Sequence, residues 1–440
     1  MRIQLSEHFT FKKLLAFVAP SIVMMVFTSV YSVVDGLFVS NVVGADAVAA
    51  IARIFPVIIV LGSIGFMIGA GGSALVAKTL GEGDKERANS YFSFLVYVTL
   101  AIGTVIAVAG QFAVPSVARL LGAEGKTYDY CVLYGRVLLG AQPFFILQNI
   151  FQSFFVAAEK PALGLIVTAA AGVTNIILDA VFIIGFKWGL AGAAAATAAS
   201  QVLGGVFPVI YFAMKNKSLL RLTKTKFYAR ALLKSCANGS SEFLSNVSAA
   251  VITMLYNFQV DKFEGDAGVA AYGAIAYVTM VFYSLFMGYT VGSAPIIAYN
   301  YGAQNKAELK NLFKKSLIII TVTGLLMTAL SQALGYPFVK MFGYNDELFK
   351  ITLRGFRIYS FVFIIVGFNM FGSSLFTALN NGPVSAAISS LRIAFCIAAV
   401  LVFPLAWGID GVWAAANFAE LFAIATTLLF VFLYRKKYGY

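Results

Sequence analysis

Charged side chains are scarce in this chain. Asp, Glu, Lys and Arg make up 12 per cent of its 440 residues, and hydrophobic residues make up 60 per cent. Soluble domains carry about 25 per cent charged residues, so most of this surface must face lipid. The start of the chain, from Arg2 to Lys13, lacks the short apolar run and small-residue cleavage site of a signal peptide. We therefore expect an integral membrane protein whose first helix is retained.

Histidine and cysteine are almost missing. His8 is the only histidine, and the three cysteines, Cys131, Cys236 and Cys396, lie far apart in apolar segments. One histidine cannot build a zinc site or a catalytic triad with these cysteines, and their spacing fits no disulfide framework. Asp-rich motifs, His-Glu pairs and Gly-rich phosphate loops are also lacking. We expect no enzymatic activity, no cofactor and no metal other than Na+.

The chain contains a long internal repeat. Thirteen of the 49 residues from Gly44 to Phe92 recur 221 positions later, between Gly265 and Phe313, without a gap. A second block pairs Trp188 and Gly189 with Trp407 and Gly408, and sets Gln201 opposite Glu420. Halves that repeat in parallel are typical of secondary transporters, in which two bundles rock about a site between or within them.

Apolar stretches long enough to span a membrane occur six times in each half. The sequence predicts an all-α membrane protein with twelve transmembrane helices in two lobes: an N-terminal lobe at 1–214, a basic linker at 215–230 and a C-terminal lobe at 231–440. The expected spans are 14–39, 47–77, 91–113, 132–156, 162–185 and 191–213 in the first half, then 231–260, 270–298, 312–335, 352–378, 384–407 and 411–434.

The distribution of positive charge predicts the topology. Net charge is +13, and the densest basic run, Lys215 to Lys234, has no acidic residue and separates the two apolar halves. Lys and Arg are in excess in the loops on the side of the termini, which predicts cytoplasmic termini in a bacterial inner membrane and no nucleic-acid partner. Prolines within the spans, Pro20 among them, allow helices to bend.

Acidic residues inside apolar helices are the main candidates for function, because a charge there costs about 2.5 to 3.5 kcal/mol. Asn175 and Asp179 lie one helical turn apart on one face, and the helical rise places them at a depth similar to Thr197 and, with tilt, to Asp35. These oxygen-bearing side chains could hold a hard cation or an exchangeable proton, but residue type does not distinguish sodium from protons. The alternative is structural: Asp35 would cap its helix, and Asp179 and Asn175 would only bind neighbouring helices.

A second acidic pair lies in the other half. Glu242 falls near mid-membrane among small polar residues, and Glu420 lies in the last span. Glu242 either faces a hydrated pocket or forms an ion pair with Arg392. Arg392 could instead form its ion pair with Glu420.

The chain resembles the multidrug and toxic compound extrusion family, and within it the DinF-like and MepA-like bacterial members. The resemblance covers nearly the whole chain, and the segments that carry it are the Val-Asp-Gly-Leu-Phe-Val stretch around Asp35, the loop 44–50, Pro161, Asn175 with Asp179, and the stretch 188–197. It implies two six-helix lobes related by a pseudo-twofold axis along the membrane normal, opening alternately to the two sides.

The resemblance also implies a function and a site. Members exchange protons or sodium ions for amphipathic, often cationic, drugs, and the N-lobe cation or proton site of DinF-like members matches Asp35, Asn175, Asp179 and Thr197. A proline bend matches Pro20, and polar cavity lining matches Tyr134 and Gln152. Other branches use a glutamate that matches Glu242 together with an acid in the tenth helix, where this chain has none. We expect a monomeric exporter of drug-like molecules; a lipid-linked oligosaccharide flippase and a narrow metabolite exporter are the alternatives.

Overall fold

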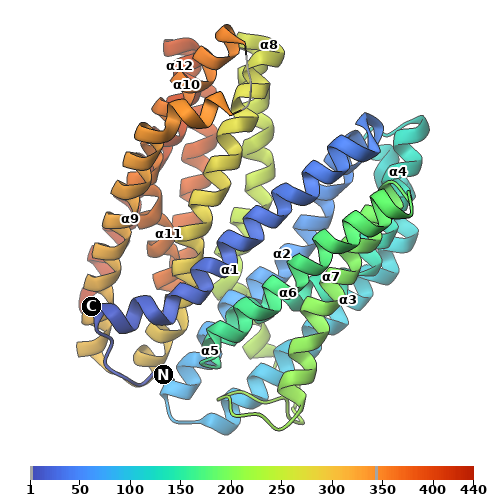
Figure 1. The fold of residues 1–440 in the computed structure, drawn as a ribbon. Helices are drawn as coiled ribbons and strands as arrows, with labels where there is room; N and C mark the ends of the chain where they lie inside the picture. Colours follow the sequence, from blue (N-terminus) through green and yellow to red (C-terminus); the bar gives the residue numbers. More distant parts are fainter. Residues whose placement is uncertain (1–2, 342–344) are drawn as a thin grey trace.

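The computed structural model describes residues 3–341 and 345–440, and these form two helical lobes that converge at the end where both termini lie (Figure 1). The first lobe contains, in chain order, α1 (Phe11–Phe38), η1 (Val39–Val43), α2 (Ala45–Gly81), α3 (Lys85–Leu120), α4 (Gly125–Gly140), α5 (Gln142–Ala157), α6 (Pro161–Asp179), η2 (Ala180–Gly185) and α7 (Leu190–Ala213). The second contains α8 (Ala229–Gly302), α9 (Lys306–Lys340), α10 (Asp346–Tyr359), α11 (Val362–Ala378) and α12 (Gly382–Tyr438).

These helices reproduce the predicted twelve spans once the breaks within them are considered. Eight helices are long and apolar enough to cross a membrane, and α4 with α5 and α10 with α11 add two bent spans, at 54° and 45°. The helices α8 and α12 each contain two predicted spans joined at a non-helical glycine. The all-α, twelve-span prediction is therefore confirmed for the described residues. The helix α3 is longer than the predicted 91–113, because its polar ends continue the helix beyond the lipid.

The repeated glycines mark the joints between spans. Gly265 in α8 has φ 56° and ψ −146°, and Gly408 in α12 has φ 56° and ψ −137°. Their counterparts in the first half, Gly44 and Gly189, also have positive φ, at 109° and 56°. Only glycine adopts such backbone angles without strain, so the same residue is required at each joint.

The lobes pack closely through α2 and α8 near the end that holds the termini. A Cβ on Gly71 would lie 1.9 Å from the Ser235 carbonyl oxygen, and one on Gly239 would lie 1.8 Å from that of Met67. The repeat appears directly in this contact: Gly81 approaches the Tyr299 carbonyl, while Gly302, its counterpart, approaches the Lys78 carbonyl. The two lobes therefore meet backbone to backbone here, and they diverge toward the opposite end (Figure 1).

A segment before the first helix also connects the lobes. Residues 3–10, here called the N-terminal strap, carry Leu5 and Phe9, whose side chains are fully buried. The Leu5 N–H donates to Oε1 of Glu159 at the end of α5, at 2.8 Å, while the Phe9 N–H donates to Oε1 of Glu308 on α9, at 2.9 Å. His8 Nδ1 lies 2.6 Å from the other oxygen of Glu308. Two buried carboxylates from different lobes thus hold one short segment.

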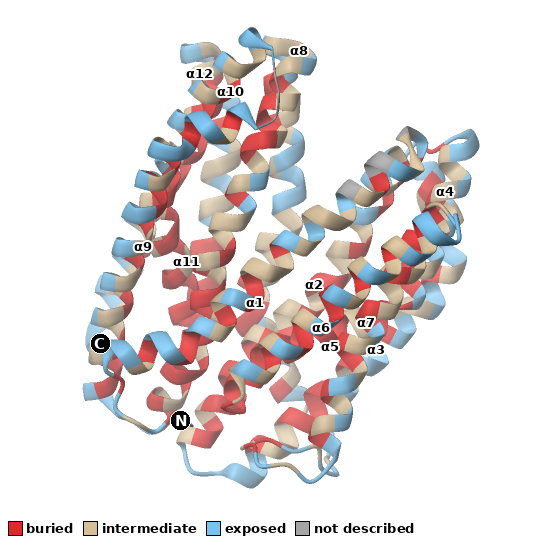
Figure 2. Ribbon diagram, viewed as in Figure 1, coloured by how far each residue is buried: buried red, intermediate tan, exposed pale blue. Residues whose placement is uncertain are grey.

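Many residues on the outside of the bundle are exposed (Figure 2), and large apolar side chains are among them. Phe112 is 80 per cent exposed on α3, and Leu405 is 79 per cent exposed on α12. Buried residues concentrate along the inner faces of the helices and near the converging end (Figure 2). This is the distribution expected of a membrane protein, in which the bilayer covers the apolar exterior.

Candidate ion-coupling site

The two aspartates of the N-terminal lobe meet in the structure. Asp35 lies near the end of α1 and Asp179 is the last residue of α6, and their carboxyl groups are close enough to form a side-chain hydrogen bond when they share a proton. With both groups ionised there is no proton between them, and no hydrogen-bond donor among the described residues reaches Oδ1 of Asp35 or either carboxylate oxygen of Asp179. Asp179 is fully buried. Such a pair is unfavourable unless a cation or a proton is added.

The amide and the hydroxyl predicted for this site are also present. Asn175 lies one turn before Asp179 on the same face of α6, and its Nδ2 donates to Oγ1 of Thr197 on α7, at 3.5 Å. This leaves the buried Oδ1 of Asn175 without a partner among the described residues. The amino group thus orients the side chain, and the acceptor oxygen lies on the same face of α6 as Asp179, one turn before it.

Tyrosines surround the aspartate pair. Tyr134 on α4 is buried and close enough to both Asp35 and Asp179 to be influenced by their charges, and Tyr31 is similarly close to Asp35. The structure therefore brings Tyr134 to the predicted site and adds Tyr31, which lies one turn from Asp35 on α1 and could have been found by that spacing. Gln152 is buried on α5 beyond the bend that separates α4 from α5, and its Oε1 has no hydrogen-bond partner among the residues that the structure describes.

A feature that sequence reasoning missed is a π-helical turn after each aspartate. The segment η1 follows α1 four residues after Asp35, η2 begins directly after Asp179, and the two turns contact each other. Such turns are rare and occur often at functional sites, because they redirect the backbone within a continuous helix. No residue type marks them in a sequence. Asp35 itself is not a helix cap, since α1 continues past it and its carbonyl accepts the Val39 N–H.

Pro20 lies inside α1, which continues through it without a break. The next turn of α1 crosses α8 closely: a Cβ on Gly288 would lie 2.8 Å from the Ser21 carbonyl oxygen and 2.4 Å from Cα of Ile22. Any bend of α1 at Pro20 would therefore change its contact with the other lobe.

The acids of the C-terminal lobe are arranged differently. Arg392 forms an ion pair with Glu420, and its Nε and Nη2 atoms each lie 2.6 Å from Oε1. The other carboxylate oxygen, Oε2, accepts a hydrogen bond from Nδ2 of Asn369 at 2.7 Å. Oδ1 of Asn369 accepts the hydroxyl of Thr427 at 2.8 Å. Both carboxylate oxygens of Glu420 therefore have partners, and Glu420, not Glu242, forms the ion pair with Arg392. The Glu242 side chain lies near Arg392, but its carboxylate has no hydrogen bond or ion pair to any described residue.

The ligand sets available to a metal are limited. Within the described ranges, no three His, Cys, Asp or Glu side chains lie close enough together to hold a metal ion. At the aspartate pair a cation would have two carboxylates, the Asn175 carbonyl oxygen and nearby hydroxyls as ligands. Hard monovalent cations and protons suit such oxygen donors.

Comparison with known proteins agrees with this architecture. The MatE family model matches residues 20–181 and 243–407. The chain is 25 per cent identical over 428 residues to the multidrug export protein MepA of Staphylococcus saprophyticus subsp. saprophyticus, covering 97 per cent of this chain and 94 per cent of that protein. It is 24 per cent identical over 432 residues to MepA of Staphylococcus haemolyticus, covering 98 and 95 per cent.

Solved structures share the fold. A MATE crystal structure in complex with MaL6 superposes with a TM-score of 0.90 at 22 per cent identity, covering 97 per cent of this chain and 96 per cent of that one. The outward-facing conformation of a multidrug resistance MATE family transporter of the MOP superfamily gives 0.89 at 22 per cent, with the same coverage. Because the family match includes one block from each repeated half and most of the chain, this protein belongs to the MatE family.

Proposed function

We propose that this protein is a secondary active multidrug exporter that exchanges protons or sodium ions for amphipathic, often cationic, organic compounds. The observation that carries the proposal is the Asp35–Asp179 pair, in which Oδ1 of Asp35 and both carboxylate oxygens of Asp179 have no hydrogen-bond donor among the described residues. Two close carboxylates in a poorly hydrated site favour binding of a proton or a cation, and binding would remove the repulsion between α1 and α6.

The proposed mechanism is alternating access. A cation or proton enters from the side opposite the termini, binds between Asp35 and Asp179, and allows the ends of α1 and α6 to pack together through η1 and η2. Because α1 also crosses α8 beside Pro20, this repacking acts on the contact between the lobes and favours release of the drug. One charge crossing 100 mV supplies about 2.3 kcal/mol and a tenfold ion gradient about 1.4, enough for a solute gradient of several hundredfold.

Export is better supported than catalysis or lipid flipping. The relatives that match over the whole chain are named multidrug export proteins, which is a transporter class. A flippase would use arginines in its cavity to hold a pyrophosphate. Five arginines lie within the expected spans: Arg392 is neutralised by Glu420 and Arg354 pairs with Asp410, while Arg53, Arg136 and Arg357 are exposed on three different helices, α2, α4 and α10. We further propose that the protein acts as a monomer in a bacterial inner membrane with both termini in the cytoplasm.

Ethidium efflux from energised vesicles tests the proposal, with a pH gradient and a sodium gradient imposed separately. We expect one gradient to drive efflux in the wild type and not in Asp35→Asn, while Asp46→Asn, which alters an exposed acid of the same lobe, retains it. Efflux by Asp35→Asn equal to that of the wild type would reject the coupling site. No efflux by any variant under either gradient would reject multidrug export itself.

A further inference from the structure

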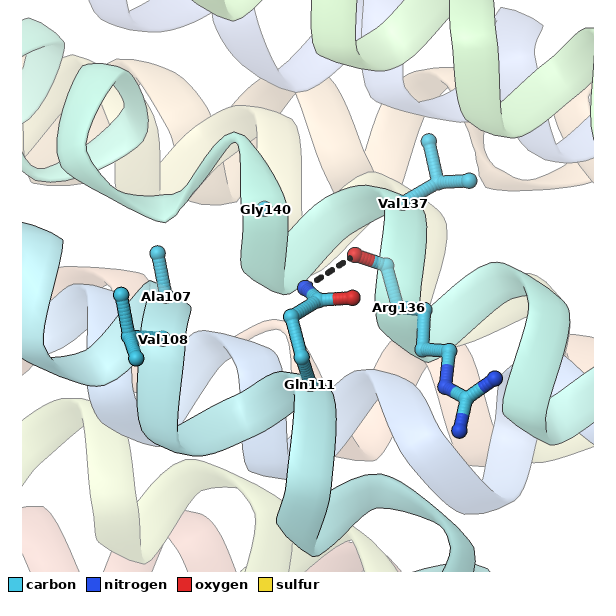
Figure 3. A pocket seen from close by; sticks show the side chains of 6 residues that line it. All are labelled: Ala107, Val108, Gln111, Arg136, Val137 and Gly140. Atoms are coloured by element: carbon cyan, nitrogen blue, oxygen red, sulfur yellow. Dashed lines mark hydrogen bonds between the residues drawn. The ribbon is translucent and has the colours of Figure 1, made fainter.

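A groove on the outside of the N-terminal lobe contains an arginine that no protein group neutralises. The groove has a volume of about 540 Å³ and is lined by Ala107, Val108 and Gln111 of α3 and by Arg136, Val137 and Gly140 of α4. Figure 3 shows Gln111 reaching from α3 to the backbone carbonyl of Arg136, a hydrogen bond of 3.0 Å, while the guanidinium extends away from this contact. The Arg136 guanidinium has no hydrogen bond or ion pair with any residue that the structure describes.

The surroundings of the groove indicate that it faces lipid rather than water. Val108 and Phe112 on the same helix are 57 and 80 per cent exposed, and such side chains on this surface are covered by acyl chains. A free phosphate or another soluble ion would have to reach Arg136 through this apolar belt. A ligand already in the bilayer would not.

The depth of Arg136 matches a phospholipid headgroup. The helix α3 has 36 residues and is about 54 Å long, so it exceeds a 30 Å hydrocarbon layer by about 12 Å at each end. Arg136 lies about 17 Å along α4 from Gly125, at the end of the lobe away from the termini, which places its Cα about 5 Å inside the hydrocarbon. A flexible arginine side chain spans that distance, so its guanidinium reaches the phosphate layer.

We propose that this groove binds one anionic phospholipid in the leaflet away from the chain termini. The planar guanidinium pairs with the phosphate through two N–H groups, and an acyl chain lies along Ala107, Val108, Val137 and Gly140. No acidic residue lines the groove, so nothing is present to bind the ammonium group of a zwitterionic headgroup. An anionic lipid is therefore preferred over phosphatidylcholine.

The internal repeat provides a matched control. Gln332 and Arg357 stand 221 positions after Gln111 and Arg136, and Gln332 Nε2 donates to the Arg357 carbonyl at 2.8 Å, as Gln111 does to Arg136. Arg357 is likewise exposed, and its guanidinium has no hydrogen bond or ion pair within the described part of the chain. The residue that corresponds to Gly140 is Phe361, whose ring is 51 per cent exposed. The second arginine therefore has the same charge and depth, with a ring where the first groove has open space.

Native mass spectrometry of the purified full-length protein, titrated with phosphatidylglycerol or phosphatidylcholine, tests the site. We expect the wild type to prefer phosphatidylglycerol, Arg136→Gln to lose about tenfold in affinity, and Arg357→Gln to stay within about twofold. Gly140→Phe should lose binding with the arginine intact. It is tolerated locally, because the nearest atom to a Cβ there is the Gln111 amide nitrogen, at 3.6 Å.

Two results would overturn the proposal. In the first, Arg357→Gln and Arg136→Gln lose lipid affinity equally. This would mean that any arginine at this depth attracts phosphate and that the groove contributes nothing to lipid binding. Displacement of the lipid by millimolar glycerol 1-phosphate would identify a site for a soluble phosphate compound instead. Melting curves recorded without lipid show whether each variant is folded, and Arg136→Gln removes no hydrogen bond or ion pair with any described residue.

Discussion

Phe9 donates its backbone N–H to Oε1 of Glu308 across 299 positions of sequence, and this bond fastens the N-terminal strap to the C-terminal lobe. The strap is held by the other lobe as well, through Leu5 and Glu159. A motion that separates the lobes at the end of the termini would strain the strap between these two bonds. The strap therefore stabilises the conformation in which that end is closed.

Replacing Glu308 with alanine should loosen the strap. The buried Phe9 N–H would lose its acceptor, at a cost of about 1 to 3 kcal/mol. We expect a lower melting temperature and faster hydrogen exchange at residues 3–9. Glu7→Gln is the control, because Glu7 pairs only with Gln4 and Lys13 at the N-terminal end, and such an exposed pair contributes little to stability. The Gln4 amide, which donates to Glu7, is left out of the comparison.

Glu7→Gln is a suitable control near neutral pH because the charge of Glu7 does not change there. The Lys13 side chain, together with the Gln4 N–H, holds the pKa of the Glu7 carboxyl below its usual range, so Glu7 stays ionised in the assay and its contribution is lost only on acidification. Equal exchange rates at residues 3–9 in Glu308→Ala and in the wild type would contradict a fastening role for Glu308.

Gly239→Ala should separate the lobes where α8 meets α2. Its Cβ would lie 1.8 Å from the Met67 carbonyl oxygen, which belongs to the backbone and cannot rotate away. Such overpacking costs about 1 to 3 kcal/mol. Gly273→Ala, in the same helix, meets no atom within 4 Å and should be neutral or slightly stabilising, since alanine is the better helix former. Similar melting temperatures for the two variants would show that the lobes tolerate wider spacing.

Glu420→Gln should destabilise the C-terminal lobe strongly. It leaves Arg392 without its counter-ion in a largely buried position, where breaking an ion pair costs about 3 to 5 kcal/mol. Replacing both residues with methionine should recover most of the loss, because no unpaired charge remains. Asp410→Asn breaks the more exposed pair with Arg354 and should cost about 1 kcal/mol or less. Unfolding in denaturant measures the stability of these three variants. A double variant no more stable than Glu420→Gln would contradict this explanation.

Asp179→Asn should lose coupled transport without losing stability. The substitution removes one of two adjacent carboxylates, so the repulsion between α1 and α6 falls while the packing volume is kept. We expect a melting temperature equal to or above that of the wild type, together with ethidium efflux at the rate of vesicles that lack the protein. A lower melting temperature with normal efflux would mean that the pair is structural, as in the alternative of a bundle held by hydrogen bonds.

Much of the site was predictable because helices impose a fixed spacing. Asn175 and Asp179 had to share a face of their helix, and the depth of each acid followed from the rise per residue. The repeated glycines were visible in the sequence at the positions where positive φ angles later appeared. The partner of Arg392 was not predictable, since Glu242 and Glu420 were both within range in depth and only the rotation of α8 and α12 separates them.

The sequence by itself determined the class of the protein, its twelve spans and its repeat, because lipid tolerates only apolar helices and because local spacing decides which residues share a helical face. Tertiary structure alone decided which side chains meet between helices. The approach of Asp35 to Asp179, the π-helical turns beside them, and the two glutamates that hold the strap all depend on how helices rotate and cross. Those quantities are fixed by packing over the whole bundle, and no single segment of sequence contains them.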